Sequence, residues 1–335
     1  MRLVTARAPT RIDFGGGWTD VPPYPAERGG CVCNLAISRY SSVTVREAPD
    51  GITIDEAGCT CHAPTVSALR SDGRAALTKA ALRRTPAEPA VLELRNDYPL
   101  GAGLGGSSAA GVALVSALAC WNGVTLGRED VAERSRALEL EDLRVPGGSQ
   151  DHYAAAFGGA LLLRFGDSAS VRRIPLTPAL VQAIEWQCTV VYTGQSRISG
   201  TTITAVLDAY RTREQRVTRA LERLGTLAAA MADALERCAL DDLGALVAEH
   251  WSYQRQLHPT ISTEGIERVL SAARAAGAVG GKALGASGGG SVLIIAPAKR
   301  AAEVRAAAAC VGQIVPFSVD IEGVRVTDHA LMGAE

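Results

Sequence analysis

A glycine-rich segment, Pro99-Leu-Gly-Ala-Gly-Leu-Gly-Gly-Ser-Ser-Ala-Ala110, constrains the fold of this chain more than any other feature. It lies between a strand-like stretch, Ala90–Arg95, and an Ala/Leu/Val-rich stretch, Ser107–Trp121, that predicts a long helix. Its glycines allow left-handed backbone torsions and bring N–H groups close to a bound anion. The helix adds free N–H groups and the positive end of its dipole. The segment therefore predicts a strand, an anion-binding loop and a helix in succession.

The loop does not match two familiar nucleotide-binding patterns. No Gly-Lys-Ser/Thr sequence follows the glycines, as a Walker loop requires. A dinucleotide fingerprint needs a different glycine spacing and an acidic partner for the ribose. Ser107 and Ser108 can cap the helix, donate to phosphate oxygens or bind a metal ion. A tight strand-to-helix turn capped by serine is the alternative that needs no ligand.

A chain of 335 residues is longer than one compact core usually holds, so we expect two domains. Between residues 166 and 178 the composition becomes polar and proline-containing, which predicts domains at 1–170 and 171–335. Strands and helices mix without strict βαβ alternation, which favours an α+β fold over a doubly wound sheet.

Four further elements matter for the comparison with the structure. Ala63–Leu82 and Thr204–Leu240 are expected to be helical, the second interrupted only by a glycine at 225. Gln150–Phe157 is expected to be a short helix or turn, followed by a strand at Ala160–Phe165. An apolar stripe on residues 204–240 could serve either as core or as the interface of a homodimer.

The charge balance excludes several classes of partner. The net charge is −1, with 34 basic and 35 acidic residues, so no electrostatic footprint for nucleic acid or an anionic membrane exists. No apolar run approaches the roughly 20 residues of a membrane span, and the N-terminus lacks a signal-peptide core. We therefore expect a cytoplasmic protein. Cys31-Val-Cys33 and Cys59-Thr-Cys61 lack zinc-knuckle spacing and predict reduced thiols, the first two neighbouring in the core.

Three ordered motifs resemble those of the GHMP kinases, the superfamily of galactokinase, homoserine kinase, mevalonate kinase and phosphomevalonate kinase. Pro99–Ala110 is similar to the signature P-x-x-x-G-L-G-S-S-A-A. Arg7–Asp20 resembles the first motif of the sugar-kinase branch, and Lys282–Ser291 resembles the third, glycine-rich motif. The resemblance covers nearly the whole chain. It implies a ribosomal protein S5 domain 2-like, ATP-binding domain over 1–170 and a ferredoxin-like domain over 171–335.

Further segments resemble bacterial D-glycero-D-manno-heptose 7-phosphate kinases, namely Gly147–Gly159, Thr193–Arg197, His250–Leu257 and Gly280–Leu284. The Trp-Thr-Asp-Val-Pro-Pro-Tyr stretch beginning at residue 18 also resembles L-fucokinase. Both relatives phosphorylate an anomeric hydroxyl group. The resemblance thus implies an ATP-dependent kinase that makes a sugar 1-phosphate, with D-glycero-D-manno-heptose 7-phosphate as the first candidate acceptor. L-fucose or another monosaccharide is the alternative acceptor.

The resemblance also implies which residues bind ATP and Mg²⁺. Glu139 and Ser107 match the family's metal-binding positions, and Glu139 lies twelve residues before Asp151, as in the heptose-kinase pattern. Glu141 and Asp142 are close enough to be confused with it, and all three acids could instead form a solvated helix face. The ATP phosphates are assigned to Pro99, Gly101, Gly103, Leu104, Gly105, Gly106, Ser107 and Ser108.

Asp151 matches the acid of the family's GG-x-Q-D pattern and is the candidate proton acceptor for phosphoryl transfer. Its alternative role is helix capping after Ser149, which stands where most relatives carry lysine. Arg11 matches the basic residue that lies between the catalytic acid and the transferred phosphate in galactokinases. It is expected to lower the pKa of Asp151 and to stabilise charge on the γ-phosphoryl group. Without the resemblance, Arg11 would be a surface strand arginine.

The first motif is expected to hold the sugar, through Trp18, Thr19 and Asp20. Trp18 replaces a polar position of galactokinases, which disfavours galactose. Arg197 and Arg255 are candidates for holding a phosphate or a distal hydroxyl, with surface salt bridges as the alternative. In the third motif, Gly288 and Gly289 belong to a backbone-lined loop expected beside the substrates, and Ser287 stands where the heptose kinases have glycine.

Two other functions remain open at this point. A GHMP kinase for a non-sugar alcohol would usually carry lysine near the first motif, whereas this chain has Arg11 and a Trp-Thr-Asp sequence. Some members of the superfamily bind sugar and ATP as catalytically silent regulators. Retention of Asp151, Arg11, Ser107 and Glu139 together argues against that alternative.

Overall fold

The structure is a computed structural model that describes residues 2–195 and 200–330. In this part of the chain, the first sheet has the strand order β12-β1-β2-β5-β3-β4, with β6 paired to β2 and β7 paired to β6. Its strands are β1 (Arg2–Gly15), β2 (Gly30–Glu47), β3 (Ile52–Glu56), β4 (Cys59–Ala63), β5 (Ala90–Asn96), β6 (Ala160–Phe165), β7 (Ser170–Ile174) and β12 (Arg325–Ala330).

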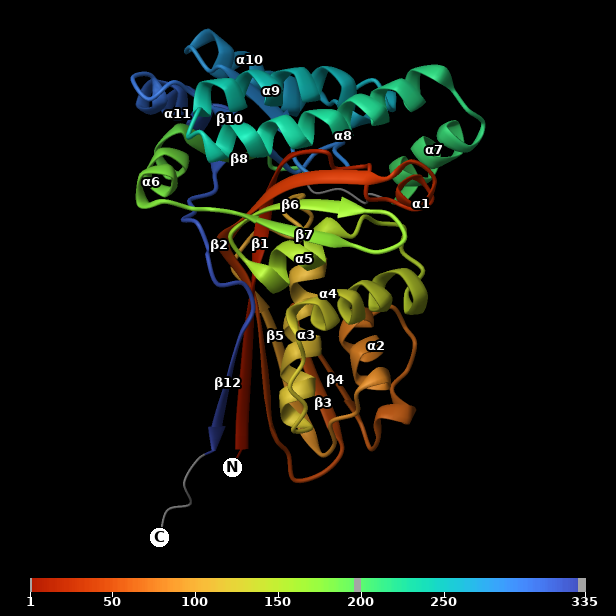
Figure 1. Cartoon of the computed structure of the whole chain (residues 1–335). Coiled ribbons are helices and arrows are strands. Elements are labelled where there is room, and N and C mark those ends of the chain that lie inside the picture. Colours follow the sequence, from red (N-terminus) through yellow and green to blue (C-terminus); the bar gives the residue numbers. More distant parts are fainter. Residues whose placement is uncertain (1, 196–199, 331–335) are drawn as a thin grey trace.

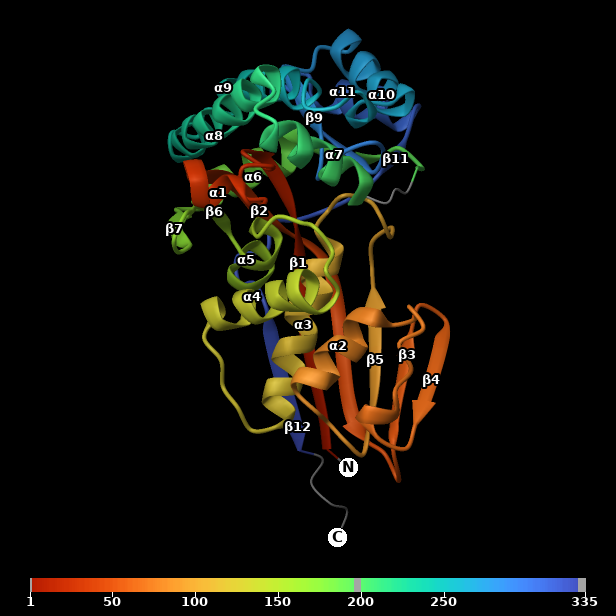
Figure 2. The same cartoon turned by 90° about the vertical axis from the view of Figure 1, so that its right-hand side faces the viewer.

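Helices cover one face of the first sheet (Figure 2). They are α2 (Ala76–Arg84), α3 (Gly106–Trp121), α4 (Arg128–Ala137) and α5 (Gln150–Phe157), while the short α1 (Tyr24–Arg28) follows β1. The central helix α3 is buried along an unbroken run from Ser108 to Ala119. Its Ala, Gly and Ser side chains are small, so β1, β2, α4 and α5 can approach it closely. This packing holds the glycine-rich loop at the start of α3.

The second sheet has the order β11-β8-β10-β9, and Figure 1 shows its helices lying across one end of the first sheet. Its strands are β8 (Cys188–Tyr192), β9 (Gly280–Ala283), β10 (Ser291–Ile295) and β11 (Gln313–Ile314). Its helices are α6 (Pro178–Gln187), α7 (Gly200–Arg211), α8 (Gln215–Glu236), α9 (Leu240–Gln254), α10 (Glu264–Ala275) and α11 (Ala301–Ala309). The mixture of sheets and helices confirms the predicted α+β class.

The apolar stripe of α8 is core. Leu227 and Met231 are buried in a cluster with Ile12 and Phe14 of β1, and Leu224 is buried with residues of the second sheet. The stripe that the sequence left open between core and interface therefore joins the two sheets.

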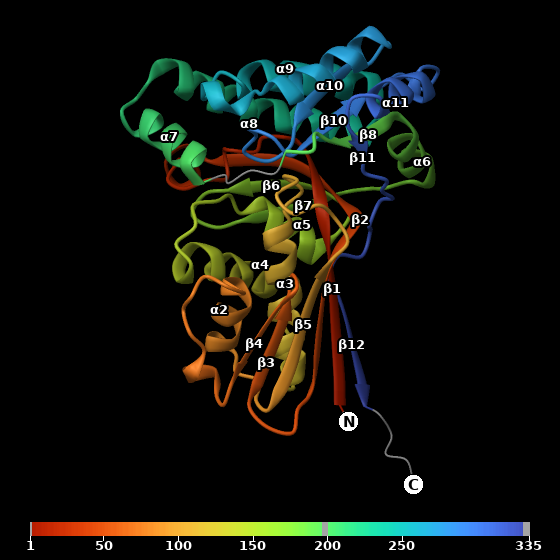
Figure 3. The same cartoon turned by 180° about the vertical axis from the view of Figure 1, so that it is seen from behind.

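The C-terminal segment returns to the first sheet. β12 pairs antiparallel with β1, so that Arg2 lies opposite Ala330, and Figure 3 shows the two strands side by side. The expected boundary at residues 170 and 171 falls at the beginning of β7, which still pairs with β6. The division into 1–170 and 171–335 stays a prediction, and β7 and β12 belong to the first sheet.

The predicted helix over Ala63–Leu82 is wrong over most of its length. Cys59–Ala63 is strand β4, which pairs with β3 after a turn in which Ala57 and Gly58 have φ values of 52° and 76°. A helix begins only at Ala76, after Gly73 with a φ of 79°. Glycines with positive φ interrupt a helix, and the sequence-based prediction overlooked them.

Helix α8 runs through residue 225, so the predicted break at that glycine is also wrong. The chain breaks instead at residues 212–214, where Arg213 has a φ of 60°. By contrast, α5 and β6 have the predicted bounds. Cys31 and Cys33 are buried, as expected of core thiols. Among the described residues, the longest helices are too short or too polar to cross a membrane.

Candidate active site

A cavity of about 450 Å³ lies between the two sheets, and parts of all three glycine-rich motifs line it. The turn after β1 contributes Trp18 and Asp20, and the loop after β9 contributes Gly285 and Ala286. Strands β3 and β5 and helix α2 contribute Glu56, Leu94 and Leu77. The residues predicted to bind ATP all line the cavity: Pro99, Gly101, Gly103, Leu104, Gly105, Gly106, Ser107 and Ser108.

The loop before α3 has the backbone geometry of an anion site. Gly101, Gly103 and Gly105 have φ values of 71°, 74° and 75°, which residues with a Cβ atom rarely adopt. Gly105 is the N-cap residue of α3 and, as a glycine, has no side chain with which to cap it. The helix therefore does not begin with the serine cap of the alternative interpretation. The first helical residues, Gly106, Ser107 and Ser108, line the cavity, where an anion could accept from the free N–H groups of the helix start.

Close packing leaves no room for a side chain at two glycines of this loop. A Cβ atom at Gly106 would lie 2.4 Å from Cε2 of Tyr98, and one at Gly103 would lie 2.8 Å from the carbonyl oxygen of Leu284. The amide of Ser291 donates to the carbonyl of Ala102 at 2.8 Å. The loop is thus held against the third motif, and the second sheet helps to fix its shape.

Arg11 and Asp151 form a bidentate pair beside the loop. Nε of Arg11 lies 2.7 Å from Oδ1 of Asp151, and Nη2 lies 2.9 Å from Oδ2. The remaining Nη1 donates to the carbonyl of Gly103 at 2.7 Å. Both carboxylate oxygens accept from Arg11, and the N-cap residue of α5 is Ser149 rather than Asp151. The guanidinium connects the candidate proton acceptor to the phosphate loop.

Burial raises the pKa of the Asp151 carboxyl, and the Arg11 guanidinium offsets this effect only in part. The net direction is upward. The expected effect of Arg11, a lowering of the pKa of Asp151, is confirmed, but the loss of hydration outweighs this attraction. A carboxylate with a raised pKa is the stronger proton acceptor, which suits a general base.

Glu139 lies at the cavity in a short π-helical segment, Leu138–Asp142. Burial acts to raise its pKa, but His152 and the hydroxyl groups of Ser107 and Ser108 lower it below the ordinary value. Glu139 is therefore ionised at neutral pH. Its Oε1 is buried and has no hydrogen-bond partner among the described residues. A free carboxylate oxygen beside hydroxyl groups is a set of hard donors that fits Mg²⁺.

The neighbouring acids face elsewhere. Glu141 and Asp142 both pair with Arg84 at the surface, so Glu139 is the acid of this segment that lines the cavity. The described residues hold no cluster of three His, Cys, Asp or Glu side chains suited to a metal ion. An ion at Glu139 would therefore take its other ligands from phosphate and water.

Asp20 is buried in the cavity wall, and its Oδ2 accepts from the backbone N–H of Gln150 at 2.9 Å. Burial, with smaller contributions from Asp151 and Asp13, raises its pKa to about 6. Trp18 is also buried in the wall, and its indole N–H has no partner within the described ranges. Both groups can meet sugar hydroxyls.

Thr19 has a different role from the one expected. Its hydroxyl donates to the carbonyl of Gly16 at 2.7 Å and accepts from the amide of Cys31 at 3.0 Å. It does not line the cavity. The side chain stabilises the turn that carries its two neighbours.

Asp20→Asn is expected to stabilise the fold at alkaline pH while weakening acceptor binding. The pKa of Asp20, about 6 against the ordinary 3.8, corresponds to roughly 3 kcal/mol lost by keeping the carboxylate ionised above pH 6. The variant should unfold at higher urea concentration than the wild type at pH 8, with the difference narrowing as the pH falls from 6 toward 4. An equal difference at both pH values would contradict the buried charge as its cause.

Three of the other predicted sugar contacts, Arg255, Gly288 and Gly289, do not line the cavity. Arg255 is exposed after α9 and does not line it, and Arg197 lies outside the described residues. Gly288 donates its N–H to the carbonyl of Ile261, and a Cβ atom at Gly289 would lie 2.9 Å from the carbonyl oxygen of Gln195. These two glycines therefore contact Ile261 and Gln195 and support the third loop on the side away from the cavity.

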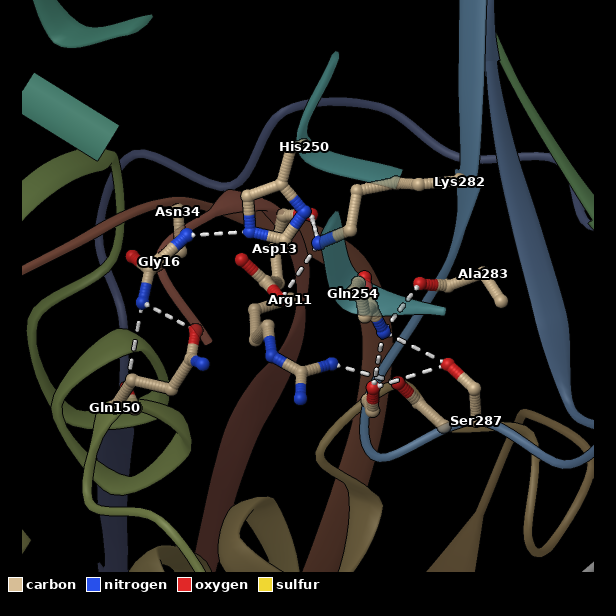
Figure 4. A network of polar contacts seen from close by, with 12 residues as sticks. Arg11, Asp13, Gly16, Asn34, Gln150, His250, Gln254, Lys282, Ala283 and Ser287 are labelled. Atoms are coloured by element: carbon tan, nitrogen blue, oxygen red, sulfur yellow. Dashed lines mark hydrogen bonds and ion pairs between the residues drawn. The ribbon is translucent and has the colours of Figure 1, made fainter. Parts of the chain in front are cut away.

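Ser287 occupies a conformation that favours glycine, with a φ of 66°. Its hydroxyl accepts from Nε2 of Gln254 at 2.8 Å, so a side-chain contact stabilises the strained residue (Figure 4).

The sequence-based reasoning missed three buried groups around the cavity. Lys282 of β9 pairs with Asp13 of β1 at 2.8 Å, and His250 of α9 accepts from a backbone amide of the first motif (Figure 4). His152 lies 2.9 Å from the Ser135 hydroxyl and 3.5 Å from Oε2 of Glu139. Asp13 lies in the first motif and Lys282 in the third. Their places in these motifs could have marked both residues as candidates for the site.

Two family models match the chain in the regions that build this site. The model for the GHMP kinases N terminal domain matches residues 73–159, and the model for the GHMP kinases C terminal matches residues 231–313. The first range contains the phosphate loop, Glu139 and Asp151, and the second contains Lys282 and the third loop. The chain belongs to the GHMP kinases.

Individual relatives of this GHMP kinase agree. It is 28% identical to D-glycero-alpha-D-manno-heptose 7-phosphate kinase of Campylobacter jejuni, over 97% of this chain and 99% of that protein. It is 30% identical to the bifunctional fucokinase/GDP-fucose pyrophosphorylase of Arabidopsis thaliana, of which it spans only 31%. The crystal structure of a D-glycero-D-manno-heptose 1-phosphate kinase from Bacteroides thetaiotaomicron is similar, with a TM-score of 0.80, 27% identity and coverage of 97% and 98% of the two chains.

Proposed function

We propose that this GHMP kinase transfers the γ-phosphoryl group of ATP to the anomeric hydroxyl group of a sugar. The observation that carries the proposal is the Arg11–Asp151 pair, which lies between the phosphate loop and the cavity wall that contains Asp20. D-glycero-D-manno-heptose 7-phosphate is the first candidate acceptor, supported by the similarity to the Campylobacter enzyme along both whole chains. L-fucose is the second, supported by the similarity to the bifunctional fucokinase/GDP-fucose pyrophosphorylase of Arabidopsis thaliana.

In this mechanism the loop amides and the first turn of α3 bind the ATP phosphates. Trp18 and Asp20 orient the sugar, and Asp151 accepts the proton of the anomeric hydroxyl. The sugar oxygen then bonds to the γ-phosphorus as the bond to the β,γ-bridging oxygen breaks, so ADP leaves. Arg11 stabilises the negative charge near the γ-phosphoryl group and keeps Asp151 in place.

Glu139 and Ser107 would hold Mg²⁺. When bound, the ion neutralises charge on the β- and γ-phosphates. The unpartnered Oε1 of Glu139 supports this assignment.

Glu139→Gln is expected to weaken divalent-cation binding by roughly 10–100-fold, because a neutral amide replaces an ionised oxygen ligand. The measurement is an electron paramagnetic resonance titration of Mn²⁺ in the presence of a non-hydrolysable ATP analogue. Glu141→Gln is the matched control, because that acid pairs with Arg84 at the surface. Equal cation affinities for the two variants would contradict the assignment.

A coupled ADP-release assay tests the proposed function. The panel comprises D-glycero-D-manno-heptose 7-phosphate, L-fucose, galactose and mevalonate. Stimulation by a sugar supports the proposal, and stimulation by mevalonate alone would show a kinase for a non-sugar alcohol. Binding of sugars without ADP release would identify a silent sensor of sugar and ATP.

The remaining assignments follow from this activity. Because ATP is the donor, we expect the protein to act in the cytoplasm on a small-molecule sugar, without nucleic-acid or membrane partners. A homodimer stays a prediction, to be tested by sedimentation.

A further inference from the structure

A buried ion pair connects the two sheets next to the sugar-binding turn. Nζ of Lys282, on β9, donates to Oδ2 of Asp13 at 2.8 Å and to the carbonyl of Asp13 at 2.9 Å (Figure 4). The side chains are 0% and 3% exposed, and the two residues are 269 positions apart in the sequence. A fully buried pair seldom stabilises a fold more than apolar residues would, so a specific role in arranging the site is a reasonable explanation for it.

His250 extends this contact to the backbone of the turn. It lies on α9, is fully buried, and its Nε2 accepts from the amide of Gly16 at 2.9 Å. Burial, together with the Lys282 ammonium, lowers the pKa of His250 well below its ordinary value. The imidazole is therefore neutral, and only a neutral imidazole has a ring nitrogen that can accept. The charge of Lys282 thus helps to keep His250 an acceptor for Gly16.

The turn itself is strained and tightly enclosed. Gly16 and Trp18 have φ values of 89° and 84°, and the second is costly for a bulky side chain. A Cβ atom at Gly15 would lie 2.4 Å from Sδ of Met231, and one at Gly17 would lie 2.5 Å from Oδ2 of Asp13. Such a backbone persists only where its surroundings hold it, and here they include β1, β2 and helices α8 and α9.

We propose that Lys282 and His250 are positioning residues for the acceptor: they hold the Gly15–Asp20 turn so that Trp18 and Asp20 face the cavity. Neither side chain lines the cavity. The inference rests on the proposed function, because it assumes that this turn binds the sugar. It assigns the second half of the chain a part in acceptor binding that is separate from the phosphate loop.

Kinetics of matched variants test this role. His250→Leu and Lys282→Met should each raise the KM of the acceptor about tenfold or more, while the Kd of ATP changes less than about twofold. His250→Gln keeps an acceptor atom near the place of Nε2 and should restore most of the acceptor KM. Lys79→Met is the control, because it removes another buried lysine that does not belong to the turn. Nζ of Lys79 lies 2.6 Å from Oδ1 of Asp72. If Lys282→Met alone does not fold, the double variant Asp13→Asn/Lys282→Met takes its place, because it removes both charges of the buried pair.

The outcomes separate this proposal from the proposed function. A KM unchanged in His250→Leu, or an equal loss of ATP and acceptor binding that Lys79→Met reproduces, would overturn the positioning role. Hydrogen exchange followed by mass spectrometry needs no substrate. His250→Leu should speed amide exchange in the 15–20 segment and leave the 99–110 loop unchanged. Unchanged exchange in both segments would refute the positioning role even if no sugar on the panel were a substrate, whereas an inactive wild type would refute only the proposed function.

Discussion

Asp151→Asn is expected to lower kcat by roughly 10²–10⁴-fold while leaving the Kd of ATP nearly unchanged. The amide cannot accept the proton of the sugar hydroxyl, yet it retains an oxygen that can accept from Arg11. The phosphate loop keeps its own contacts, because Arg11 also donates to Gly103. The measurement combines the ADP-release assay with calorimetric titration of ATP.

A matched control for this variant is Asp167→Asn, in the exposed turn between β6 and β7. It makes the same chemical change away from the cavity and should keep ordinary turnover. If Asp151→Asn also kept ordinary turnover, Asp151 would not be the general base.

Arg11→Met is expected to lower the free energy of unfolding by about 3–5 kcal/mol, because it leaves a largely buried carboxylate without its cation. The side chain of Arg11 is 4% exposed and that of Asp151 is 21% exposed, so water replaces little of the lost interaction. Turnover should fall as well, since the guanidinium near the γ-phosphoryl group is lost. Urea unfolding at pH 8 measures the stability.

The pH dependence and a double variant identify the cause of this loss. Without Arg11, burial is opposed mainly by the attraction of His152, so the pKa of Asp151 rises further. The loss of stability should therefore shrink as the pH falls and the carboxyl is protonated. Arg11→Met/Asp151→Asn should lose less than the sum of the single variants. A loss that is additive and independent of pH would show that packing, rather than charge, explains the effect.

In the Gly15–Asp20 turn, the resemblance to the first motif predicted some residues of the site correctly and not others. Trp18 and Asp20 line the cavity, as the resemblance to the first motif implied, whereas Thr19 supports the turn instead. Three consecutive residues in an irregular turn point in different directions. No periodicity indicates which of them face a ligand, so only the tertiary structure separates Thr19 from its neighbours.

The sequence likewise could not show which acid of the π-helical segment lines the cavity. Glu139, Glu141 and Asp142 are close in sequence, and a solvated helix face was a valid interpretation for all three. In the structure Glu139 lies among His152, Ser107 and Ser108, while the other two meet Arg84. The π-helical turn changes the angular spacing of the side chains, and this change could not be derived from the sequence.

The sequence by itself determined the local features: the glycine-rich loop before α3 and the bounds of α5 and β6. The resemblance to the family motifs implied the candidates Arg11, Asp151 and Asp20. Glycine conformations, helix propensity and motif order depend on neighbouring residues, so they can be recognised without a structure. Only the tertiary structure decided the contacts of Lys282 with Asp13, of His250 with Gly16 and of β12 with β1, each between distant parts of the chain. It also decided the upward pKa of Asp151, because burial is a property of the folded chain.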